Sequence, residues 1–282
     1  MKVLLAGAFG NLGADVLREL IKNGHDVVAA DIAERDLGVS GYEFKKIDVT
    51  DPETLKGICD GCEAVITTVG LTKGSATVTP YEIDYRGNLN LLGEAKAAGV
   101  KHFTFISVIK ADKAPHIPML HAKAMFEEEL KNSGIEYVIH RPTGYFYDII
   151  KVFKPMILKG EVTLLGKKPI HANVISTEDF AEFIVAHMTD SNASYDVGGK
   201  ETYSYEELAT LCFEAAGKPV VIKRAPALLF DVLAFINKVK KTGKEGVLKF
   251  GKWTMTEEMV GSTVYGDMSF AEYIKESFKE EK

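Results

Sequence analysis

The sequence predicts an α/β fold in which helices cover both faces of a doubly wound parallel sheet, followed by a smaller subdomain. Two features predict it. Short apolar runs rich in β-branched residues alternate with longer helical patterns over the first half of the chain, and a glycine-rich loop joins the first run to the first helix. Such alternation is typical of strand–helix–strand crossovers, which build parallel sheets. We expect a main domain over residues 1–145 and a subdomain over 146–282, with segments near 172–198 returning to the main domain.

The strands of the main domain are expected at its short apolar runs. Each run is largely continuous rather than alternating, as in strands that a parallel sheet buries on both faces. The expected strands cover residues 2–6, 25–30, 43–49, 63–69, 102–107 and 135–140.

Helices are expected between these strands, where apolar residues recur at helical spacing. Gly24, Gly99 and Gly134 stand where the helices should end, because glycine is the usual residue just past a helix C-terminus. Thr50-Asp51-Pro52-Glu53 has the pattern of a capped helix start. The main-domain helices are expected at 12–23, 81–98 and 118–133. In the second half we expect helices at 145–158, 176–188, 204–216, 226–241 and 269–278, and strands at 195–197 and 220–223.

Composition excludes several classes of protein. The chain has 282 residues, 46% hydrophobic and 26% charged, so it can bury a core without help from disulfides or metal. A formal net charge of −6 argues against general affinity for nucleic acid. No apolar run is long enough to span a membrane, and Val3–Ala6 is too short for a signal peptide. Cys59, Cys62 and Cys212 lack a metal-site pattern. We therefore expect a cytoplasmic monomer or homodimer without a metal.

Three glycines follow the first strand at a spacing that suits a diphosphate. One glycine permits a tight turn, one lets the backbone approach the pyrophosphate, and one allows helix and strand to pack closely. The helix behind them offers unpaired N–H groups and the positive end of its dipole. The context therefore predicts a Rossmann-type dinucleotide loop formed by Gly7, Ala8, Phe9, Gly10, Asn11, Leu12 and Gly13.

The end of the second strand predicts which dinucleotide is bound. Asp31 ends that strand, and a carboxylate there accepts hydrogen bonds from the adenosine ribose hydroxyls while repelling a 2′-phosphate. Asp31 and its neighbour Ile32 are therefore expected at the cofactor, with NAD favoured over NADP. Arg35 lies four residues on and could soften that preference, so NADP remains possible.

Two further strand ends are expected on the adenine side of the cofactor. Asp48, with Val49 beside it, is placed to meet the adenine amino group. The run Thr67, Thr68, Val69 and Gly70 supplies small residues where the chain must pass the adenine-side ribose. Each segment is also an ordinary strand end, so both interpretations stay open.

These residues together resemble the short-chain dehydrogenase/reductase superfamily in its extended and atypical branches, and most of all NmrA-like and isoflavone-reductase-like members. The resemblance covers most of the chain. It implies that the segment after Pro142 and the C-terminal third shape the substrate or partner site. It rests on the glycine loop and Asp31, and on Asp48-Val49-Thr50-Asp51, the run from Asp84 to Leu92, the run from Gly99 to Ser107, Lys123, and Arg141-Pro142-Thr143-Gly144.

The resemblance also implies a catalytic pair, of which this sequence keeps one member. Family members usually carry Tyr-x-x-x-Lys, whose lysine holds the nicotinamide ribose and lowers the tyrosine pKa. Lys123 matches the lysine, but Met119 stands at the tyrosine position, and a thioether cannot transfer a proton. His121 is close in sequence, but two residues on a helix face apart. Tyr145 follows the sixth strand and is the replacement we name, although packing is the more usual role for a tyrosine.

Four further cofactor contacts are implied by the same resemblance. The asparagine of the fourth helix aligns with Asp84, although Asn88 lies one turn away and is the residue we name. Ser107 begins the segment that carries the family's serine or threonine. Pro142 and Thr143 follow the sixth strand at the nicotinamide end.

Three functions remain open. The first is an NAD(P)-dependent oxidoreductase acting on a carbonyl or activated double bond of a small organic substrate. The second is a non-catalytic dinucleotide-binding sensor or assembly protein, which the missing tyrosine favours. The third is a nucleotide-sugar epimerase or dehydratase, whose reversible oxidation most needs the absent acid/base group.

Two features outside the cofactor site carry expectations of their own. His140 lies in an apolar strand and is expected to be a core histidine with satisfied ring nitrogens. Lys238, Lys240, Lys241 and Lys244 follow the apolar run Leu228–Ile236, which could form a membrane-surface helix. Asp231 interrupts that run and favours the solvated edge of a lid helix instead.

Overall fold

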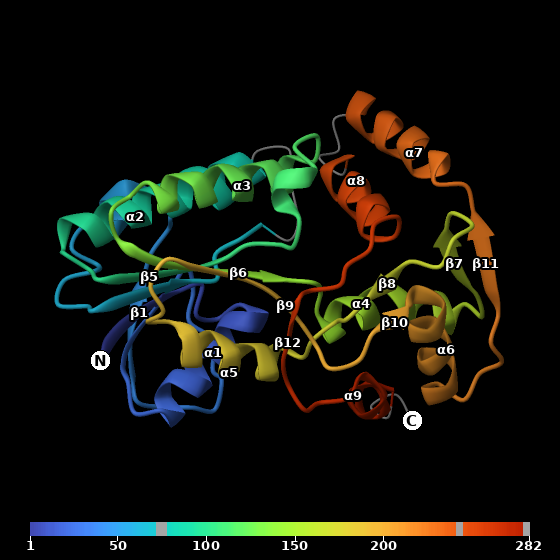
Figure 1. The fold of residues 1–282 in the computed structure, drawn as a ribbon, viewed down its shortest axis with the longest axis horizontal. Coiled ribbons are helices and arrows are strands. Elements are labelled where there is room, and N and C mark those ends of the chain that lie inside the picture. The colour runs from blue at the N-terminus through green and yellow to red at the C-terminus, as the bar shows by residue number, and fades with distance from the viewer. Residues whose placement is uncertain (72–77, 241–244, 279–282) are drawn as a thin grey trace. The chain divides into compact units, whose positions relative to one another are not determined.

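The computed structural model describes residues 1–71, 78–240 and 245–278 (Figure 1). Its contacts divide the chain into two compact units. Unit 1 comprises Met1–Arg141 and Phe180–Tyr195, and unit 2 comprises Pro142–Asp179 and Asp196–Lys282. The chain therefore leaves the first unit after Arg141 and returns to it for one segment.

The largest sheet of the described chain has eight strands in the order β12-β9-β6-β5-β4-β1-β2-β3. The neighbouring pairs from β3 through β6 are parallel, as is the pair of β9 and β12. This is the doubly wound α/β arrangement that the sequence predicts. The strands are β1 Lys2–Ala6, β2 Asp26–Asp31, β3 Tyr42–Lys46, β4 Ala64–Thr67, β5 His102–Ile106, β6 Glu136–Pro142, β9 Ala193–Gly198 and β12 Thr263–Val264.

Helices cover both faces of the sheet in unit 1. Figure 1 shows α2 and α3 on one face and α1 and α5 on the other. The core under α2 and α3 is built from side chains such as Leu91, Phe103, Phe105 and Phe126. The helices are α1 Asn11–Lys22, α2 Asn88–Ala97, α3 Pro118–Lys131 and α5 Thr177–His187.

Two segments expected to be ordinary helix differ from that expectation. Residues Tyr81–Gly87 form a π-helix that runs into α2. Pro52–Leu55 forms only a short 3-10 helix, although Asp51 caps it as expected by accepting a hydrogen bond from the Glu53 N–H. Gly57 follows at a φ of 70°, which turns the chain out of any longer helix.

His140 is buried as expected, but its ring nitrogens are not satisfied. Neither nitrogen has a hydrogen-bond partner among the described residues. The ring lies instead among Phe180, Phe183 and Tyr195, at centroid distances of 6.1, 5.5 and 5.8 Å. Burial lowers the pKa of His140 to about 3. The expectation of a satisfied histidine was therefore wrong, because its surroundings come from an aromatic segment about forty residues further along the chain.

Unit 2 contains two small sheets and several helices. β7 Val162–Leu165 pairs in parallel with β11 Ile222–Ala225, and β8 His171–Ala172 pairs antiparallel with β10 Tyr203–Ser204. Ser204 and Glu207 form a capping box at the start of α6. β7 and α8 were not anticipated from the sequence. The helices are α4 Phe146–Leu158, α6 Tyr205–Ala215, α7 Leu228–Val239, α8 Glu245–Thr254 and α9 Phe270–Ser277.

Within the described ranges, no helix is both long and apolar enough to cross a membrane. The cysteines Cys59, Cys62 and Cys212 are buried free thiols.

Candidate dinucleotide site

The glycine loop between β1 and α1 has the backbone that a diphosphate site needs. Gly7 has a φ of 79°, and its N–H donates to the Ala30 carbonyl at 2.8 Å, which fixes the turn across the ends of β1 and β2. A side chain at Gly7 would lie 2.7 Å from Thr68 Oγ1. A side chain at Gly13 would overlap the Gly7 carbonyl oxygen. The loop and the first turn of α1 therefore pack too closely for any residue but glycine at these two positions.

The N-terminus of α1 leaves its amides available to an anion. Gly10 is the N-cap and has no side chain to bond them, and no acidic residue stands in the first turn. The unsatisfied N–H groups and the helix dipole together favour a phosphate at this end. Asn11 and Gly10 are exposed, whereas Ala8, Phe9 and Leu12 are buried and anchor the loop.

Asp31 lies beside the same loop. Its Oδ2 accepts a hydrogen bond from the Phe9 N–H at 2.9 Å, and its Oδ1 accepts one from the Ile32 N–H at 2.7 Å. Each carboxylate oxygen can accept a second donor, so the group can still bind ribose hydroxyls. Arg35 donates to the Phe9 carbonyl, which brings a positive charge to this loop. Ile32 is 64% exposed, so its side chain is accessible to a ligand.

The two strand ends expected on the adenine side differ in how they are used. Asp48 is exposed, and its Oδ1 already accepts from the Thr50 amide and hydroxyl at 2.9 and 2.7 Å. Val49 is buried, and a side chain at Gly87 would lie 2.6 Å from Val49 Cγ2. Val49 therefore packs the sheet against the π-helical segment, while Asp48 remains at the surface.

The end of β4 joins the loop to the π-helical segment. Thr68 Oγ1 donates to the Gly7 carbonyl at 3.0 Å. Thr67 Oγ1 donates to Asn88 Oδ1 at 2.7 Å, and the Asn88 amide donates to the Asp84 carbonyl at 3.1 Å. Asn88 is thus fully buried in a structural network. Val69 and Gly70 continue the chain from Thr68 toward Asp84.

A buried ion pair lies next to Gly70. Lys123 Nζ is 3.1 Å from Asp84 Oδ1 and donates to the Ile106 carbonyl at 3.0 Å. Asp84 also accepts from the Leu71 N–H at 3.1 Å. Burial raises the pKa of the Asp84 carboxyl, and the positive charge of Lys123 partly offsets that rise. The structure therefore pairs Lys123 with Asp84, the residue aligned with the family's asparagine position, and not with Asn88.

The proton-transfer residues expected of the family are incomplete in unit 1. Ser107 is 2% exposed, and its hydroxyl has no partner within the described part of the chain. Met119 is half-buried, and His121 is exposed while Lys123 is buried, as their spacing on α3 requires. Ser107 is thus the one unpartnered hydroxyl among the predicted site residues of this unit.

The remaining predicted site residues belong to unit 2. Pro142 and Thr143 are buried, and Thr143 donates through its hydroxyl to the Asn173 carbonyl at 2.7 Å. Tyr145 is the N-cap of α4, and its ring stacks on Tyr147 at a centroid distance of 5.4 Å. Burial raises the pKa of Tyr145. A raised pKa keeps the phenol protonated at neutral pH and also makes it a weaker acid, so this environment does not activate Tyr145 for proton transfer.

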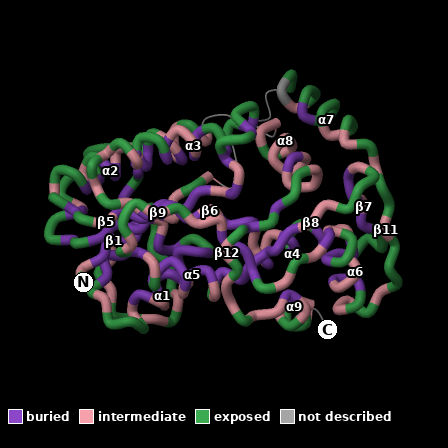
Figure 2. Tube along the Cα trace, viewed as in Figure 1, coloured by how far each residue is buried: buried purple, intermediate pink, exposed green. Residues whose placement is uncertain are grey.

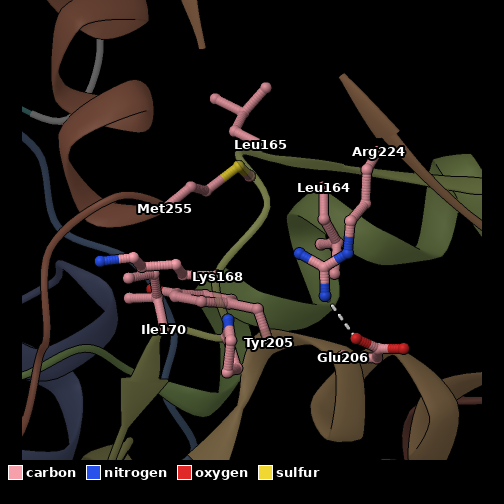
Figure 3. Close-up of a pocket in the computed structure, with 9 residues that line it drawn as sticks. Leu164, Leu165, Lys168, Ile170, Tyr205, Glu206, Arg224 and Met255 are labelled. Atoms are coloured by element: carbon pink, nitrogen blue, oxygen red, sulfur yellow. Dashed lines mark hydrogen bonds and ion pairs between the residues drawn. The ribbon is translucent and has the colours of Figure 1, made fainter. Parts of the chain in front are cut away.

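A small pocket in unit 2 does not meet the needs of an organic substrate. Figure 3 shows its lining, in which Arg224 from β11 forms an ion pair with Glu206 from α6. Its volume is about 10 Å³, which is room for one water molecule. Its other labelled lining residues are Leu164, Leu165, Lys168, Ile170, Tyr205 and Met255.

Comparison with known proteins places the chain among dinucleotide-binding proteins. A family model described as NAD(P)H-binding matches residues 7–191. Photosystem II assembly factor Ycf39 of Guillardia theta is 28% identical over 243 residues, which are 84% of this chain and 77% of that protein. The chloroplastic divinyl chlorophyllide a 8-vinyl-reductase of Zea mays is 29% identical over 283 residues, which are 89% of this chain and 69% of that protein.

Solved structures share the fold. NADPH-dependent quinone oxidoreductase QOR2 from Escherichia coli, complexed with NADPH, superposes with a TM-score of 0.72 at 20% identity, covering 98% of this chain and 100% of that one. Triphenylmethane reductase from Citrobacter sp. superposes with a TM-score of 0.74 at 19% identity, covering 99% of this chain and 100% of that one. The matched region of the family model contains the glycine loop, Asp31, Asp84 and Lys123.

Proposed function

The chain belongs to the NAD(P)H-binding family, as an atypical member of the short-chain dehydrogenase/reductase superfamily, and from that premise we propose that it is an oxidoreductase. The proposed reaction is reduction of a small organic molecule at a carbonyl or activated double bond. The observation that carries the proposal is the buried ion pair of Lys123 and Asp84, at 3.1 Å, in the same unit as an intact glycine loop. A buried lysine is costly, so its retention calls for a role.

The residues present fit a dinucleotide. We assign the diphosphate to the glycine loop and the first-turn amides of α1, from Asn11 to Gly13, because the Gly7, Ala8, Phe9 and Gly10 amides already donate within the loop and to β2. We assign the adenosine ribose to Asp31 and the nicotinamide ribose to Lys123. Lys123 Nζ has three N–H donors, and among the described residues two acceptors lie within reach, Asp84 Oδ1 and the Ile106 carbonyl. One donor therefore remains for a ribose hydroxyl. The bound nicotinamide, when reduced, supplies a hydride.

We propose that the site prefers NADH to NADPH. The Asp31 carboxylate disfavours a 2′-phosphate by repulsion, and Arg35 beside the Phe9 carbonyl reduces that discrimination. We therefore propose that NADH binds more tightly and that NADPH binds as well.

The missing tyrosine favours reduction of a conjugated double bond. In such a reaction negative charge develops on an atom distant from the hydride acceptor, so water or another residue, for which we name Tyr145, can deliver the proton. A carbonyl needs its proton at the reacting oxygen, where Met119 has none to give. The 29% identity with a protein named for reducing a vinyl group supports the same choice.

Steady-state turnover tests this proposal. The full chain is mixed with NADH or NADPH and a panel of quinones, enones and aldehydes, and the loss of reduced nicotinamide absorbance is followed. We expect turnover of at least one enone or quinone. Lys123→Met should lower kcat/KM about a hundredfold, because the group that orients the nicotinamide ribose is lost and the hydride donor is misplaced. Lys131→Met on the same helix, whose lysine pairs with Glu128 at the surface, is the control and should keep full activity. If the unaltered chain turns over none of these compounds, the proposed oxidoreductase activity is refuted.

A second candidate is a dinucleotide-binding assembly or sensor protein. Two observations favour it: Met119 at the tyrosine position, and 28% identity with a protein named as an assembly factor. It predicts NADH binding by calorimetry without turnover, together with a protein partner retained by the tagged chain. Loss of that partner in a Gly13→Ala variant would link the dinucleotide to assembly.

A further inference from the structure

Helix α7 carries a continuous apolar face that the protein leaves open. Leu228, Val232, Phe235 and Val239 follow one another at helical spacing along one line of the helix. They are 68%, 48%, 67% and 65% exposed. Figure 2 shows α7 as largely exposed along its length. These four large apolar side chains form a contiguous exposed stripe. Soluble monomeric proteins seldom expose a stripe of this kind, so it calls for a binding partner.

The exposed face is wider than a single line. Leu229, Leu233 and Ile236 flank it on one side and are also exposed, whereas Ala234 lies on the opposite side and is buried. No charged residue interrupts the face. We call the seven exposed apolar residues of α7 the α7 face.

Asp231 does not interrupt this face, although its place in the sequence suggested that it would. Its carboxylate is 2.6 Å from Lys252 Nζ of α8, so it is held at the side of α7 that meets α8 and its charge is paired. The reason for regarding this segment as the solvated edge of a lid is thereby removed.

Positive charge accompanies the α7 face. From Leu228 to Lys252 the sequence has six lysines against two carboxylates, in a chain whose net charge is −6. Lys240 follows the helix directly and is exposed, and Lys249 lies on α8, where Lys252 forms the ion pair with Asp231. Lys241 and Lys244 lie outside the described residues. An apolar helix face with basic residues beside it is the pattern of helices that lie in the interface of an anionic membrane.

We propose that the α7 face docks onto the surface of a membrane that contains anionic phospholipid. The apolar side chains would enter the boundary between headgroups and acyl chains, and Lys240 and Lys249 would meet the phosphates. A helix of 12 residues is about 18 Å long, too short to cross a hydrocarbon core of about 30 Å, so it lies in the plane of the surface. The chain would thus be a peripheral membrane protein.

Charge also favours an anionic membrane surface over a second copy of the chain as the partner of the α7 face. A symmetric dimer through the α7 face would place the same lysine-rich segment of each copy near the other. Like charges would then oppose each other across the interface. An anionic lipid surface offers the complementary charge instead.

Vesicle flotation of the full chain tests the proposal. The probes are vesicles of phosphatidylcholine alone and vesicles of equal parts phosphatidylcholine and phosphatidylglycerol. We expect flotation with the anionic vesicles, little with the neutral ones, and loss of binding as salt is raised. Leu228→Gln with Phe235→Gln should weaken binding to anionic vesicles at least about tenfold, because each large apolar side chain buried contributes that much or more. Val220→Gln, at an exposed valine outside α7, is the matched control and should bind as the unaltered chain does.

The outcomes separate the alternatives. Circular dichroism and NADH titration of each variant show that the fold and the cofactor site are intact, so a failure of docking is distinct from a failure of the proposed function. Absence of flotation with anionic vesicles would overturn the proposal. So would equal binding to neutral vesicles, or a dimer in analytical ultracentrifugation that the double variant converts to a monomer. Retention of a protein partner that the double variant loses, with no flotation, would assign the face to that partner instead.

Discussion

Asp31 is the residue on which the choice of dinucleotide depends. Both of its carboxylate oxygens accept backbone N–H groups, from Phe9 at 2.9 Å and Ile32 at 2.7 Å. We predict that Asp31→Asn weakens NADH binding about tenfold, since a hydrogen bond to a charged group contributes roughly 1.5–3 kcal/mol. NADPH binding should fall less or improve, because the repulsion of its 2′-phosphate is removed. Isothermal titration calorimetry with both dinucleotides measures the ratio.

Asp26→Asn is the control for that experiment. Asp26 begins the same strand, β2, and is exposed. It should leave both affinities unchanged. An equal loss of NADH and NADPH binding in Asp31→Asn would mean that Asp31 supports the loop and does not discriminate between the dinucleotides.

The burial of His140 makes the free energy of unfolding depend on pH. Burial holds its pKa at about 3, below its ordinary value of 6.5, so the unfolded chain binds a proton over that range and the folded chain does not. Its contribution to stability is complete above pH 6.5 and is lost as pH falls toward 3, by up to about 1.4 kcal/mol per pH unit. We predict that His140→Phe and His140→Leu reduce the loss of unfolding free energy as pH falls from 6.5 toward 3. Urea unfolding at a series of pH values measures this. The exposed His121→Gln should not reduce that loss, and an unchanged slope in both His140 variants would contradict the assignment.

The sequence anticipated some site residues and not their partners. Lys123 could be found because its position before Gly134 and Arg141-Pro142 matches a family spacing. The residue at the family's asparagine position could not be chosen between Asp84 and Asn88, and the ion pair of Lys123 with Asp84 was not predicted, because α-helical spacing does not apply across a π-helix from Tyr81 to Gly87. The surroundings of His140 could likewise not be predicted from the sequence, because they depend on residues distant in the chain.

At the scale of elements, the junction of β1 and α1 makes a sharp prediction. A side chain at Gly13 would overlap the Gly7 carbonyl, so Gly13→Ala must displace the loop from the helix. We predict a loss of about 3 kcal/mol or more in stability, at the upper end of overpacking costs, and loss of dinucleotide binding. Gly93→Ala in α2 is the matched control, because nothing lies within 4 Å of its added methyl group. It should stabilise the protein by about 0.5–1 kcal/mol. Thermal unfolding with and without NADH measures both, and retained NADH binding by Gly13→Ala would contradict the site.

Elements were predictable where local pattern and tertiary packing agree. The strands and helices of unit 1 have strong periodicity and glycine stops, and they form close to the expected bounds. The helix expected after Asp51 had a good cap but only Leu55 as a buried anchor, and it ends within one turn. β11 was expected at 220–223 and forms at Ile222–Ala225, whereas its partner β7 is a four-residue strand that the sequence analysis did not identify.

At the scale of the whole molecule, the division into two units predicts where a bound dinucleotide acts. The glycine loop, Asp31, Asp84 and Lys123 all belong to unit 1, which also contains Phe180–Tyr195. A ligand at one hundred times its dissociation constant stabilises the folded state that binds it by about 2.7 kcal/mol. That stabilisation slows hydrogen exchange only in the parts that must open together with the site.

We therefore predict that NADH protects amides of β1, the glycine loop, α1 and α3 from hydrogen exchange, while the buried core of α6 in unit 2 is little changed. Mass spectrometry of peptides from both units measures this. The Gly13→Ala variant with NADH should show no protection, which separates binding from nonspecific effects. Equal protection of α6 would mean that the two units open as one cooperative body, and protection of α6 alone would place the dinucleotide away from the glycine loop.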